Sequence, residues 1–451
     1  MTPSKPSDAA VSPERQLNKT LILILPAMDQ PVLRMLIYFI LRTPPGTFSL
    51  FIIPALTPPE YRVTILNQKL FWSDRDFVGG ALVGISCATG NVTSSYSLAD
   101  QYRKAGSKVV MGGVHVSYLP QEALEHCDSV VIGEAESVWP QVVHDYENGE
   151  LKKIYEGKAL EDYFSPCFDY FMKLDPRVLY CTGLILSRGC KYRCEFCAPM
   201  FGKLRFIKME QAIALIERVV RAAPRPFGIK PVLILRDDNI FSSPPFAKEL
   251  FEKLIPLNIK WAGNSSLDIA FDDEALRLAQ ASGCCSLFIG FETINPLRFA
   301  KTSVGNVRTP NDYLKAIRKL KSRGIKVTGS FILGFDEDTP KDYLRMVWFW
   351  MRAGLEIVSL TMLTPFPGTP LFRKLEAQNR ILTHDWRKYN SLANVVYQPK
   401  KTSPLSLQGW FVMMRVAGIL TSRFFYVTGG IILFLFLLPG IFYSILRMLG
   451  L

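Results

Sequence analysis

Three cysteines lie close together near the middle of the chain, Cys190, Cys194 and Cys197. Their spacing is C-x3-C-x2-C, and they follow an apolar run that is typical of a buried strand. Thiolates are soft ligands that suit iron, zinc and copper(I), and iron–sulfur clusters are commonly held by closely spaced cysteines. Three thiolates on one loop therefore predict a [4Fe–4S] cluster in which one iron has no protein ligand.

A zinc site is the alternative for these cysteines. Structural zinc sites usually close with four cysteine or histidine ligands, often as two C-x2-C pairs. No histidine lies between His144 and His384, so no nearby imidazole completes the set. The other cysteines show no framework spacing, which favours a reducing compartment over a secreted disulfide fold. The pattern thus favours the iron–sulfur interpretation.

The cysteine spacing, with Phe196 directly before the last cysteine, resembles the radical S-adenosylmethionine (radical SAM) superfamily. That resemblance implies that the open iron binds the methionine part of S-adenosylmethionine, that Phe196 belongs to the cofactor site, and that residues 181–395 form a partial (β/α)6 barrel. Strand and helix patterns alternate there as a barrel requires. The predicted strands are residues 183–187, 232–235, 261–267, 286–291, 326–333 and 357–363, and one amphipathic helix covers residues 209–222.

Polar residues end several of these predicted strands, which is where barrel active sites lie. Asp237, Asp238 and Asn239 follow the strand at 232–235, and Ser265 and Glu292 end the next two. The resemblance implies that the first three face the methionine ammonium and that the last two bond the ribose hydroxyls of S-adenosylmethionine. The alternative is that these side chains are caps or solvated turn residues. Their recurrence at successive strand ends behind a metal motif favours cofactor binding.

Residues 19–150 have the pattern of a doubly wound, Rossmann-like α/β domain, in which ligands bind beyond the carboxyl ends of the strands. Short apolar strands are predicted at residues 21–25, 61–66, 81–86, 108–111 and 129–132. Small and polar residues follow three of them, and small residues let a bulky planar ligand approach the backbone. These residues are Ser86, Thr89, Gly112, Gly113, His115, Gly133 and Glu134.

Residues 58–145 resemble the cobalamin-binding domain that precedes the radical SAM core in the B12-dependent subfamily, most clearly at residues 110–115 and 131–136. The resemblance implies that the seven residues named above contact cobalamin. None of the four histidines has an Asp two places earlier, so the Asp-x-His-x-x-Gly motif is absent. We therefore expect His115 near the cofactor but not on its cobalt. No G-x-G-x-x-G follows a strand, which disfavours a nicotinamide site.

The two ends of the chain differ in composition. Residues 1–18 are polar and predict a disordered tail, and residues 151–180 predict a linker. Residues 396–451 predict a membrane-associated segment, because residues 424–446 carry no charge and are long enough to span a bilayer, while residues 410–420 suit an interfacial helix. A buried helix of the soluble fold is the alternative. The first apolar run is too short for a signal peptide, so we expect a cytoplasmic protein attached to the cytoplasmic face of the membrane.

The formal net charge of +13 is compatible with nucleic acid, anionic lipid or an acidic ligand. A nucleic-acid enzyme would need an added binding module, and the carboxyl-terminal region where one could lie is apolar, so we expect no nucleic-acid partner.

The fold expected is α/β: a cobalamin-binding domain, a radical SAM barrel and a C-terminal hydrophobic helix. By resemblance, the cofactors are a [4Fe–4S] cluster, S-adenosylmethionine and cobalamin, and the reductant is a flavodoxin or ferredoxin. The resemblance implies reductive cleavage of S-adenosylmethionine to a 5′-deoxyadenosyl radical, with C-methylation of an unactivated carbon in a hydrophobic or lipid substrate as the leading outcome. Cyclisation or oxidation without methyl transfer is one alternative. A membrane-tethered cobalamin or iron–sulfur sensor is another.

Overall fold

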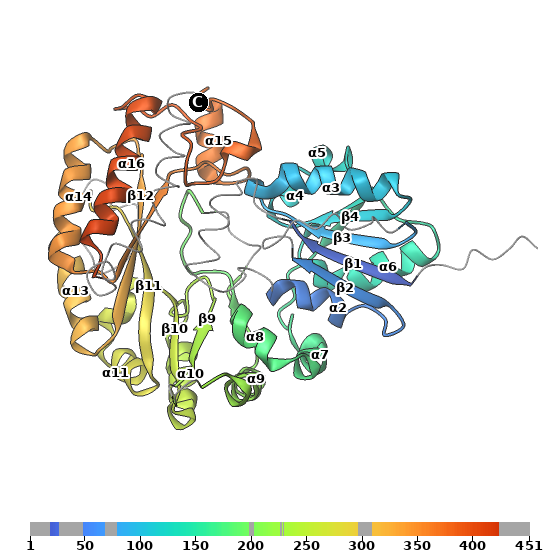
Figure 1. Ribbon diagram of the computed structural model, residues 1–451, viewed down its shortest axis with the longest axis horizontal. Coiled ribbons are helices and arrows are strands. Elements are labelled where there is room, and N and C mark those ends of the chain that lie inside the picture. Colours follow the sequence, from blue (N-terminus) through green and yellow to red (C-terminus); the bar gives the residue numbers. More distant parts are fainter. Residues whose placement is uncertain are drawn as a thin grey trace, which may run out of the picture.

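Two parallel β-sheets, each built from one half of the chain, lie side by side in the molecule (Figure 1). The computed structural model describes residues 19–26, 48–67, 79–197, 203–225, 228, 230–295 and 309–423. The predicted tail at residues 1–18 lies outside these ranges. The α/β class and the parallel strands expected from the sequence are confirmed.

The first sheet has six strands in the order β2-β1-β3-β4-β5-β6. The two faces of β1 are both covered: Leu21 and Leu23 pack against α6 (Trp139–Glu147), while Ile22 and Ile24 pack against α3 (Val92–Lys104). Burial on both faces explains why these strands appear in the sequence as continuous apolar runs. The strands are β1 Thr20–Leu25, β2 Arg62–Asn67, β3 Leu82–Ser86, β4 Lys108–Gly112, β5 Ser129–Gly133 and β6 Ile154–Gly157.

The second sheet has five strands in the order β13-β12-β11-β10-β9, and residue Leu184 adds a parallel bridge beside β9. The helices lie along its outer side (Figure 1). The strands are β9 Val232–Leu235, β10 Lys260–Ser265, β11 Cys284–Glu292, β12 Lys326–Leu333 and β13 Ile357–Met362. The helices include α8 Pro176–Thr182, α9 Met209–Ala222, α10 Pro244–Leu254, α11 Asp273–Ala281, α13 Pro310–Ser322, α14 Pro340–Ala353 and α15 Pro370–Ala377.

The inner side of this second sheet is more open than its outer side. Along β11 the side chains of Leu287, Ile289 and Phe291 are buried against helices, whereas Phe288, which alternates with them, is exposed. Alternation along a strand sends successive side chains to opposite faces. The sheet therefore presents one apolar face to its helices and leaves space on the other.

The region predicted as a linker, residues 151–180, is partly regular structure. Strand β6 pairs in parallel with β5 and extends the first sheet to Gly157, and helices α7 (Phe168–Lys173) and α8 follow. Phe171 of α7 is fully buried in the core that surrounds the second sheet. These short elements were not predicted because the mixed charge and the prolines of this region are typical of a linker.

The described part of the carboxyl-terminal region packs on the second sheet. Helix α16 (Pro404–Thr421) contains the predicted interfacial residues 410–420 and buries Leu407, Phe411 and Met414 in the same core as the strands of the second sheet. Among the described residues no helix is long and apolar enough to cross a membrane. The uncharged run at 424–446 lies outside the described ranges, so its predicted bilayer span stays a prediction.

Candidate cofactor site between the two sheets

The loop that carries the three cysteines is anchored on two sides. It follows β7 (Ser187–Arg188), which pairs with β8 (Arg205–Phe206). Lys191 Nζ lies 2.6 Å from Asp268 Oδ2, and the Tyr192 hydroxyl donates to the same carboxylate. On the other side the Leu371 N–H at the start of α15 donates to the Glu195 carbonyl at 2.9 Å. The loop is thus held between the ends of β10 and β13.

The thiols of this loop lie near one another and near polar donors. The Asn239 amide nitrogen lies 3.8 Å and the Ser242 hydroxyl 3.7 Å from Cys190 Sγ. Burial, together with the charges of Glu292, Cys197 and Cys190, raises the pKa of Cys194 to about 12. A bound cationic metal centre reverses this penalty by stabilising thiolates.

The donor set fits an iron–sulfur cluster, since three thiols with hydrogen-bond donors at sulfur are typical of such sites. Within the described ranges, no three His, Cys, Asp or Glu side chains are grouped closely enough to hold a single metal ion.

Asp237 is the most buried carboxyl group at the strand ends, with 1% of its surface exposed. Its Oδ1 accepts from the Leu186 N–H at 3.1 Å and the Ser187 hydroxyl at 2.5 Å. Its Oδ2 is buried and has no hydrogen-bond partner among the described residues, and burial raises the pKa of the carboxyl to about 6. An unpaired buried acceptor is costly unless a ligand satisfies it. This geometry fits a cationic or N–H-bearing ligand such as the S-adenosylmethionine ammonium.

Asn239 and Asp238 lie on either side of this strand end. Asn239 Oδ1 accepts from the backbone N–H groups of Phe241 and Ser266, so its amide nitrogen is directed to Cys190. Asp238 instead faces the cavity described below, and burial raises the pKa of its carboxyl group. Asn239 therefore lies toward the cysteine loop, whereas Asp238 lines the cavity.

Ser265 and Glu292 end the next two strands. The Ser265 hydroxyl is buried and donates to the Ser266 carbonyl. The neighbouring Asn264 side chain lies on the opposite face of β10, and its amide donates to the Asp237 carbonyl at 2.9 Å. Glu292 adopts φ 59°, a left-handed conformation, just after a register shift in the β11–β12 pairing. Burial raises the pKa of its carboxyl to about 7. Such strain at a non-glycine residue is concentrated at functional sites.

Phe196 packs beside Phe335, with ring centroids 6.0 Å apart, and contacts the barrel core. It therefore links the cysteine loop to the end of β12. Whether Phe196, like the other predicted cofactor contacts, touches S-adenosylmethionine stays a prediction.

A cavity lies between the carboxyl ends of the two sheets. Its walls are mostly apolar, with Leu23, Leu25 and Trp139 on one side and Ile185 and Gly189 on the other. Five of the seven residues predicted to contact cobalamin line it: Ser86, Gly112, Gly113, Gly133 and Glu134. Asp238, from the predicted S-adenosylmethionine set, lines the same cavity. The structure thus brings the two predicted sites together.

Close backbone approach shapes the side of this cavity that the predicted cobalamin contacts line. Gly113 has φ 103°, and a Cβ added there would lie 2.3 Å from the Cys87 carbonyl oxygen. Gly133 has φ 83°, and its Cβ would lie 2.4 Å from the Gly157 carbonyl oxygen. Only glycine meets both demands, and the result is a cradle of bare backbone that suits a large planar ligand.

His115 and Thr89 do not line this cavity. His115 is fully buried, its Nδ1 lies 3.1 Å from the Thr89 hydroxyl, and its Nε2 lies 3.4 Å from Glu122 Oε1. Its ring packs edge-on against Trp386, with centroids 5.2 Å apart. Helix α4 (Val114–Tyr118) directs the imidazole into the packing with α3, and the predicted contact of these two residues with cobalamin stays a prediction.

Arg188 is a residue of the site that the sequence reasoning missed. Its guanidinium lines the cavity and pairs with Glu134 at 3.0 Å and Glu136 at 2.5 Å, both in the turn after β5. Arg205 also pairs with Glu134, and both guanidinium groups lie over the ring of Tyr163. The signal available was an arginine directly before the Gly-Cys of the metal loop, and two glutamates in one turn of the other domain.

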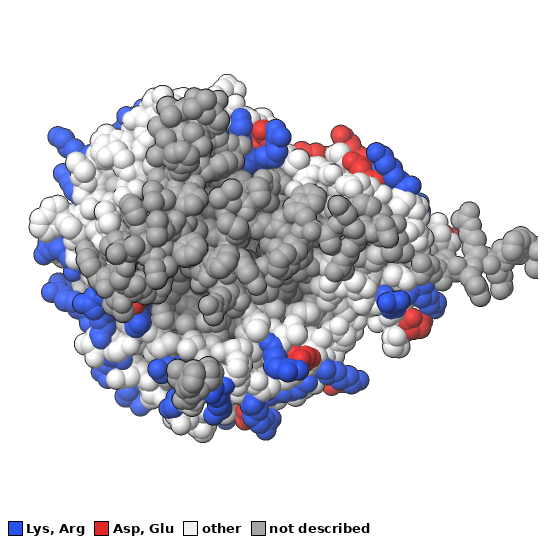
Figure 2. All heavy atoms as spheres, in the orientation of Figure 1, with Lys and Arg blue, Asp and Glu red and all other residues white. Residues whose placement is uncertain are grey.

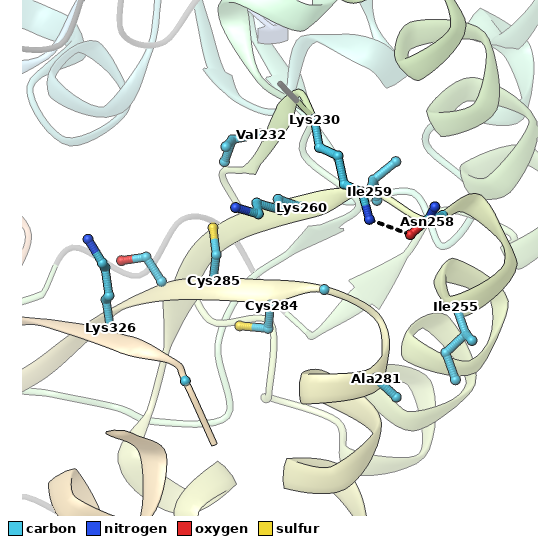
Figure 3. A pocket seen from close by; sticks show the side chains of 13 residues that line it. Lys230, Val232, Ile255, Asn258, Ile259, Lys260, Ala281, Cys284, Cys285 and Lys326 are labelled. Carbon is cyan, nitrogen blue, oxygen red and sulfur yellow. Dashed lines mark hydrogen bonds between the residues drawn. The ribbon is translucent and has the colours of Figure 1, made fainter. Parts of the chain in front are cut away.

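A second cavity lies at the opposite end of the second sheet (Figure 3). Lys230, Lys260 and Lys326 come from the starts of strands, and Cys284 and Cys285 lie beside them. Lys230 donates to Asn258 at 2.6 Å and Lys326 pairs with Glu356 at 3.0 Å. No residue predicted to bind a cofactor lines this cavity.

Comparison with known proteins agrees with this arrangement. The Radical SAM superfamily model matches residues 184–349 and the B12 binding domain model matches residues 76–143. The chain is 31% identical over 377 residues to bacteriochlorophyllide d C-12(1)-methyltransferase of Chlorobaculum tepidum, covering 81% of each chain.

Two further proteins extend the comparison. Hopanoid C-2 methylase of Rhodopseudomonas palustris is 26% identical, over 76% of this chain and 66% of the relative. The fold is similar to that of TsrM from Kitasatospora setae, a radical S-adenosylmethionine methyltransferase solved with cobalamin and a [4Fe–4S] cluster (TM-score 0.60, 17% identity, 80% of this chain and 75% of that one). The chain therefore belongs to the radical SAM superfamily, as a cobalamin-dependent methyltransferase whose family cofactors are a [4Fe–4S] cluster, S-adenosylmethionine and cobalamin.

Proposed function

We propose that this enzyme transfers a methyl group to an unactivated carbon of a hydrophobic acceptor, either a lipid or a planar pigment. The observation that carries the proposal is the single apolar cavity lined by both predicted cofactor sites, with Gly113 and Glu134 on one wall and Asp238 and Gly189 on the other. A methyl donor and a radical source must both reach one carbon, and a shared cavity provides this proximity.

When bound, the cluster, S-adenosylmethionine and cobalamin supply the electron, the radical and the methyl group. The protein supplies position and electrostatics. Cys190, Cys194 and Cys197 would hold the cluster, with Asn239 and Ser242 donating to the Cys190 sulfur. Hydrogen bonds to cluster sulfur raise the reduction potential, so these two side chains would ease electron uptake.

Four carboxyl groups would have two further roles, cofactor binding and the positioning of the cysteine loop. Asp237 and Glu292 would bind the polar groups of S-adenosylmethionine, since both carboxyl groups are buried at strand ends, one after β9 and one at the end of β11. Glu134 and Glu136 would not contact the reacting atoms; they hold Arg188 and so fix the cysteine loop against the cobalamin cradle. The apolar walls would exclude water and so strengthen the electrostatic interactions that position the bound groups.

The acceptor class follows from the cavity and from the relatives. The named relatives act on a bacteriochlorophyllide and on a hopanoid, both of which are bulky and largely apolar. The apolar residues of β1 and Trp139 in the cavity wall support an acceptor of this kind.

The test is anaerobic turnover of the reconstituted full chain with S-adenosylmethionine that carries a deuterated methyl group, a chemical reductant, cobalamin, and extracts of lipids or chlorin pigments. We expect one 5′-deoxyadenosine and one S-adenosylhomocysteine for each labelled product. The Cys194→Ala variant should abolish 5′-deoxyadenosine formation.

Two results would contradict the proposal. Formation of 5′-deoxyadenosine with an altered product that lacks the labelled methyl group would indicate ring closure or oxidation. Absence of S-adenosylmethionine cleavage by a protein with an intact cluster and bound cobalamin would indicate a sensor.

A further inference from the structure

Large apolar side chains form an exposed surface on the outer sides of α14 and α16. On α14 the exposed side chains of Leu344, Trp348 and Met351 follow the i, i+4, i+7 spacing of one helix face. Trp348 is 63% exposed, although it is the kind of side chain that globular proteins usually cover. The two helices pack together, with the rings of Tyr343 and Trp410 5.7 Å apart, and run side by side in Figure 1.

Helix α16 continues this surface without charge. Leu405, Met413 and Leu420 are exposed along its outer side, at 66%, 61% and 42%. The only charged residue in the helix, Arg415, turns inward, where its guanidinium reaches toward the Leu392 carbonyl at 3.4 Å. A helix that turns its one cation inward and several large apolar side chains outward is suited to an apolar partner.

Basic residues border the same surface. Lys341, Arg345 and Arg352 are exposed on the flank of α14 next to the apolar row. The acidic residue of this helix, Asp342, is buried; it caps the helix start through Thr339 and pairs with Arg345 at 3.0 Å. Along the barrel edge in Figure 2, Lys and Arg are more evident than Asp and Glu. An apolar face with a cationic border matches an anionic lipid surface.

The chain leaves the described structure at this same edge. The Arg423 N–H donates to the Leu355 carbonyl, just beyond the end of α14, and the sequence continues with residues 424–446, which carry no charge. We propose that the α14/α16 face docks on the surface of an anionic lipid bilayer, with Trp348 and Met413 inserted at the headgroup level. This goes beyond methyl transfer and does not depend on it.

The proposal is tested by flotation of the full chain with vesicles of phosphatidylcholine alone or mixed with phosphatidylglycerol. The double variant Trp348→Glu/Met413→Glu should lower the partition onto mixed vesicles by roughly tenfold or more, because two apolar side chains no longer insert. Leu382→Glu, a substitution at an exposed leucine outside this face, should leave it unchanged. Arg345→Gln/Arg352→Gln should reduce only the preference for anionic vesicles.

A second measurement reports on Trp348 directly. Brominated lipids should quench tryptophan fluorescence in the wild-type protein, and Trp348→Phe should remove most of that quenching. S-Adenosylmethionine cleavage without vesicles should be equal in the double variant and the wild type, which separates this surface from the catalytic proposal. Three outcomes would overturn the inference: no binding to mixed vesicles, equal binding by the double variant, or a change only in oligomeric state.

Discussion

Glu292 combines backbone strain with a buried carboxyl group at the end of β11. Its φ of 59° lies in a region that costs a non-glycine residue about 1–3 kcal/mol. Burial also raises the pKa of the carboxyl to about 7, which adds to the cost of keeping this residue charged. Since neither feature stabilises the fold, we expect the Glu292 side chain to serve ligand binding.

We therefore expect Glu292→Gly to stabilise the protein and to weaken its use of S-adenosylmethionine. Glycine adopts a positive φ without strain, so the free energy of unfolding should increase by about 1 kcal/mol even after the entropy cost of glycine. The melting temperature should rise accordingly. The apparent KM for S-adenosylmethionine, measured by 5′-deoxyadenosine formation, should rise roughly tenfold, the cost of about one hydrogen bond.

Ser391→Gly is the matched control, because Ser391 has φ 58° and is not among the predicted cofactor contacts. It should gain stability without a change in KM. A Glu292→Gly protein that melts at a lower temperature, or that cleaves S-adenosylmethionine with unchanged KM, would show that the strain at Glu292 has a structural purpose.

Asp338 gives the protein a stability that falls as pH rises. Its Oδ2 accepts from the Gly334 and Phe335 N–H groups, but burial raises the pKa of the carboxyl to about 7. Between its unfolded value near 4 and this raised value the folded state binds the extra proton, so the free energy of unfolding declines with pH. We expect Asp338→Asn to remove a decline of up to a few kcal/mol between pH 5 and pH 8, measured by denaturant unfolding.

A matched control is Asp385→Asn. Arg387 lowers the pKa of the Asp385 carboxyl, so this group is already ionised in both states across pH 5 to 8. Its variant should show the same slope as the wild type. Parallel curves for the wild type and Asp338→Asn would contradict the argument.

At the scale of elements, the strands were the most predictable part of the molecule. The run Leu21–Leu25, for example, is buried on both faces and so shows no polar interruption. The helices α13, α14 and α15 each begin at a Thr-Pro pair, which caps the helix and occupies its first position. Strand β6 was missed because four residues that include Glu156 give too little signal.

The candidate site was predictable only in part, for a physical reason. Carboxyl ends of parallel strands meet at one edge, so the strand-end residues of each sheet could be grouped from the sequence. The direction of a side chain depends on its partners, and these are distant in the chain. His115 turns inward to Glu122, which also accepts from the Trp386 indole, and Arg188 turns to Glu134 and Glu136. No local pattern reports such pairs.

Turn glycines in the first sheet can be tested at this scale. Gly113→Ala should abolish or strongly weaken cobalamin binding, because its Cβ would strike the Cys87 backbone at 2.3 Å and shift the cradle. Gly106→Ala carries similar backbone strain, with φ 88°, but its Cβ would meet no atom within 4 Å. Titration with hydroxocobalamin should show that Gly113→Ala lowers the affinity by at least about tenfold and that Gly106→Ala leaves it unchanged. Both variants should lose about 1–3 kcal/mol of stability. Equal affinities would argue against a cradle at Gly113.

At the scale of the whole molecule, the two sheets face each other across a cavity and are tied at two places. Arg188 and Arg205 reach from the second unit to Glu134 of the first. On the opposite side the Trp386 indole donates to Glu122 at 3.0 Å. The cysteine loop begins one residue after Arg188, so the ion pairs set the distance between the predicted cluster site and the cobalamin cradle.

We expect Arg188→Gln to uncouple the two cofactor sites. Arg188 and its two carboxylate partners are largely buried, and removing one member of a buried pair costs about 3–5 kcal/mol because the other charge is left uncompensated. The cysteines and the strand-end carboxyl groups are unchanged, so 5′-deoxyadenosine should still form. Labelled methyl transfer should fall by at least about tenfold, since misplacement by one ångström has that effect on a reaction between two bound groups. Arg177→Gln breaks an exposed pair with Asp175 and should change neither rate, because exposed ion pairs contribute little to stability. If Arg188→Gln lowered both products in the same proportion, the ion pairs would serve the fold and not the coupling.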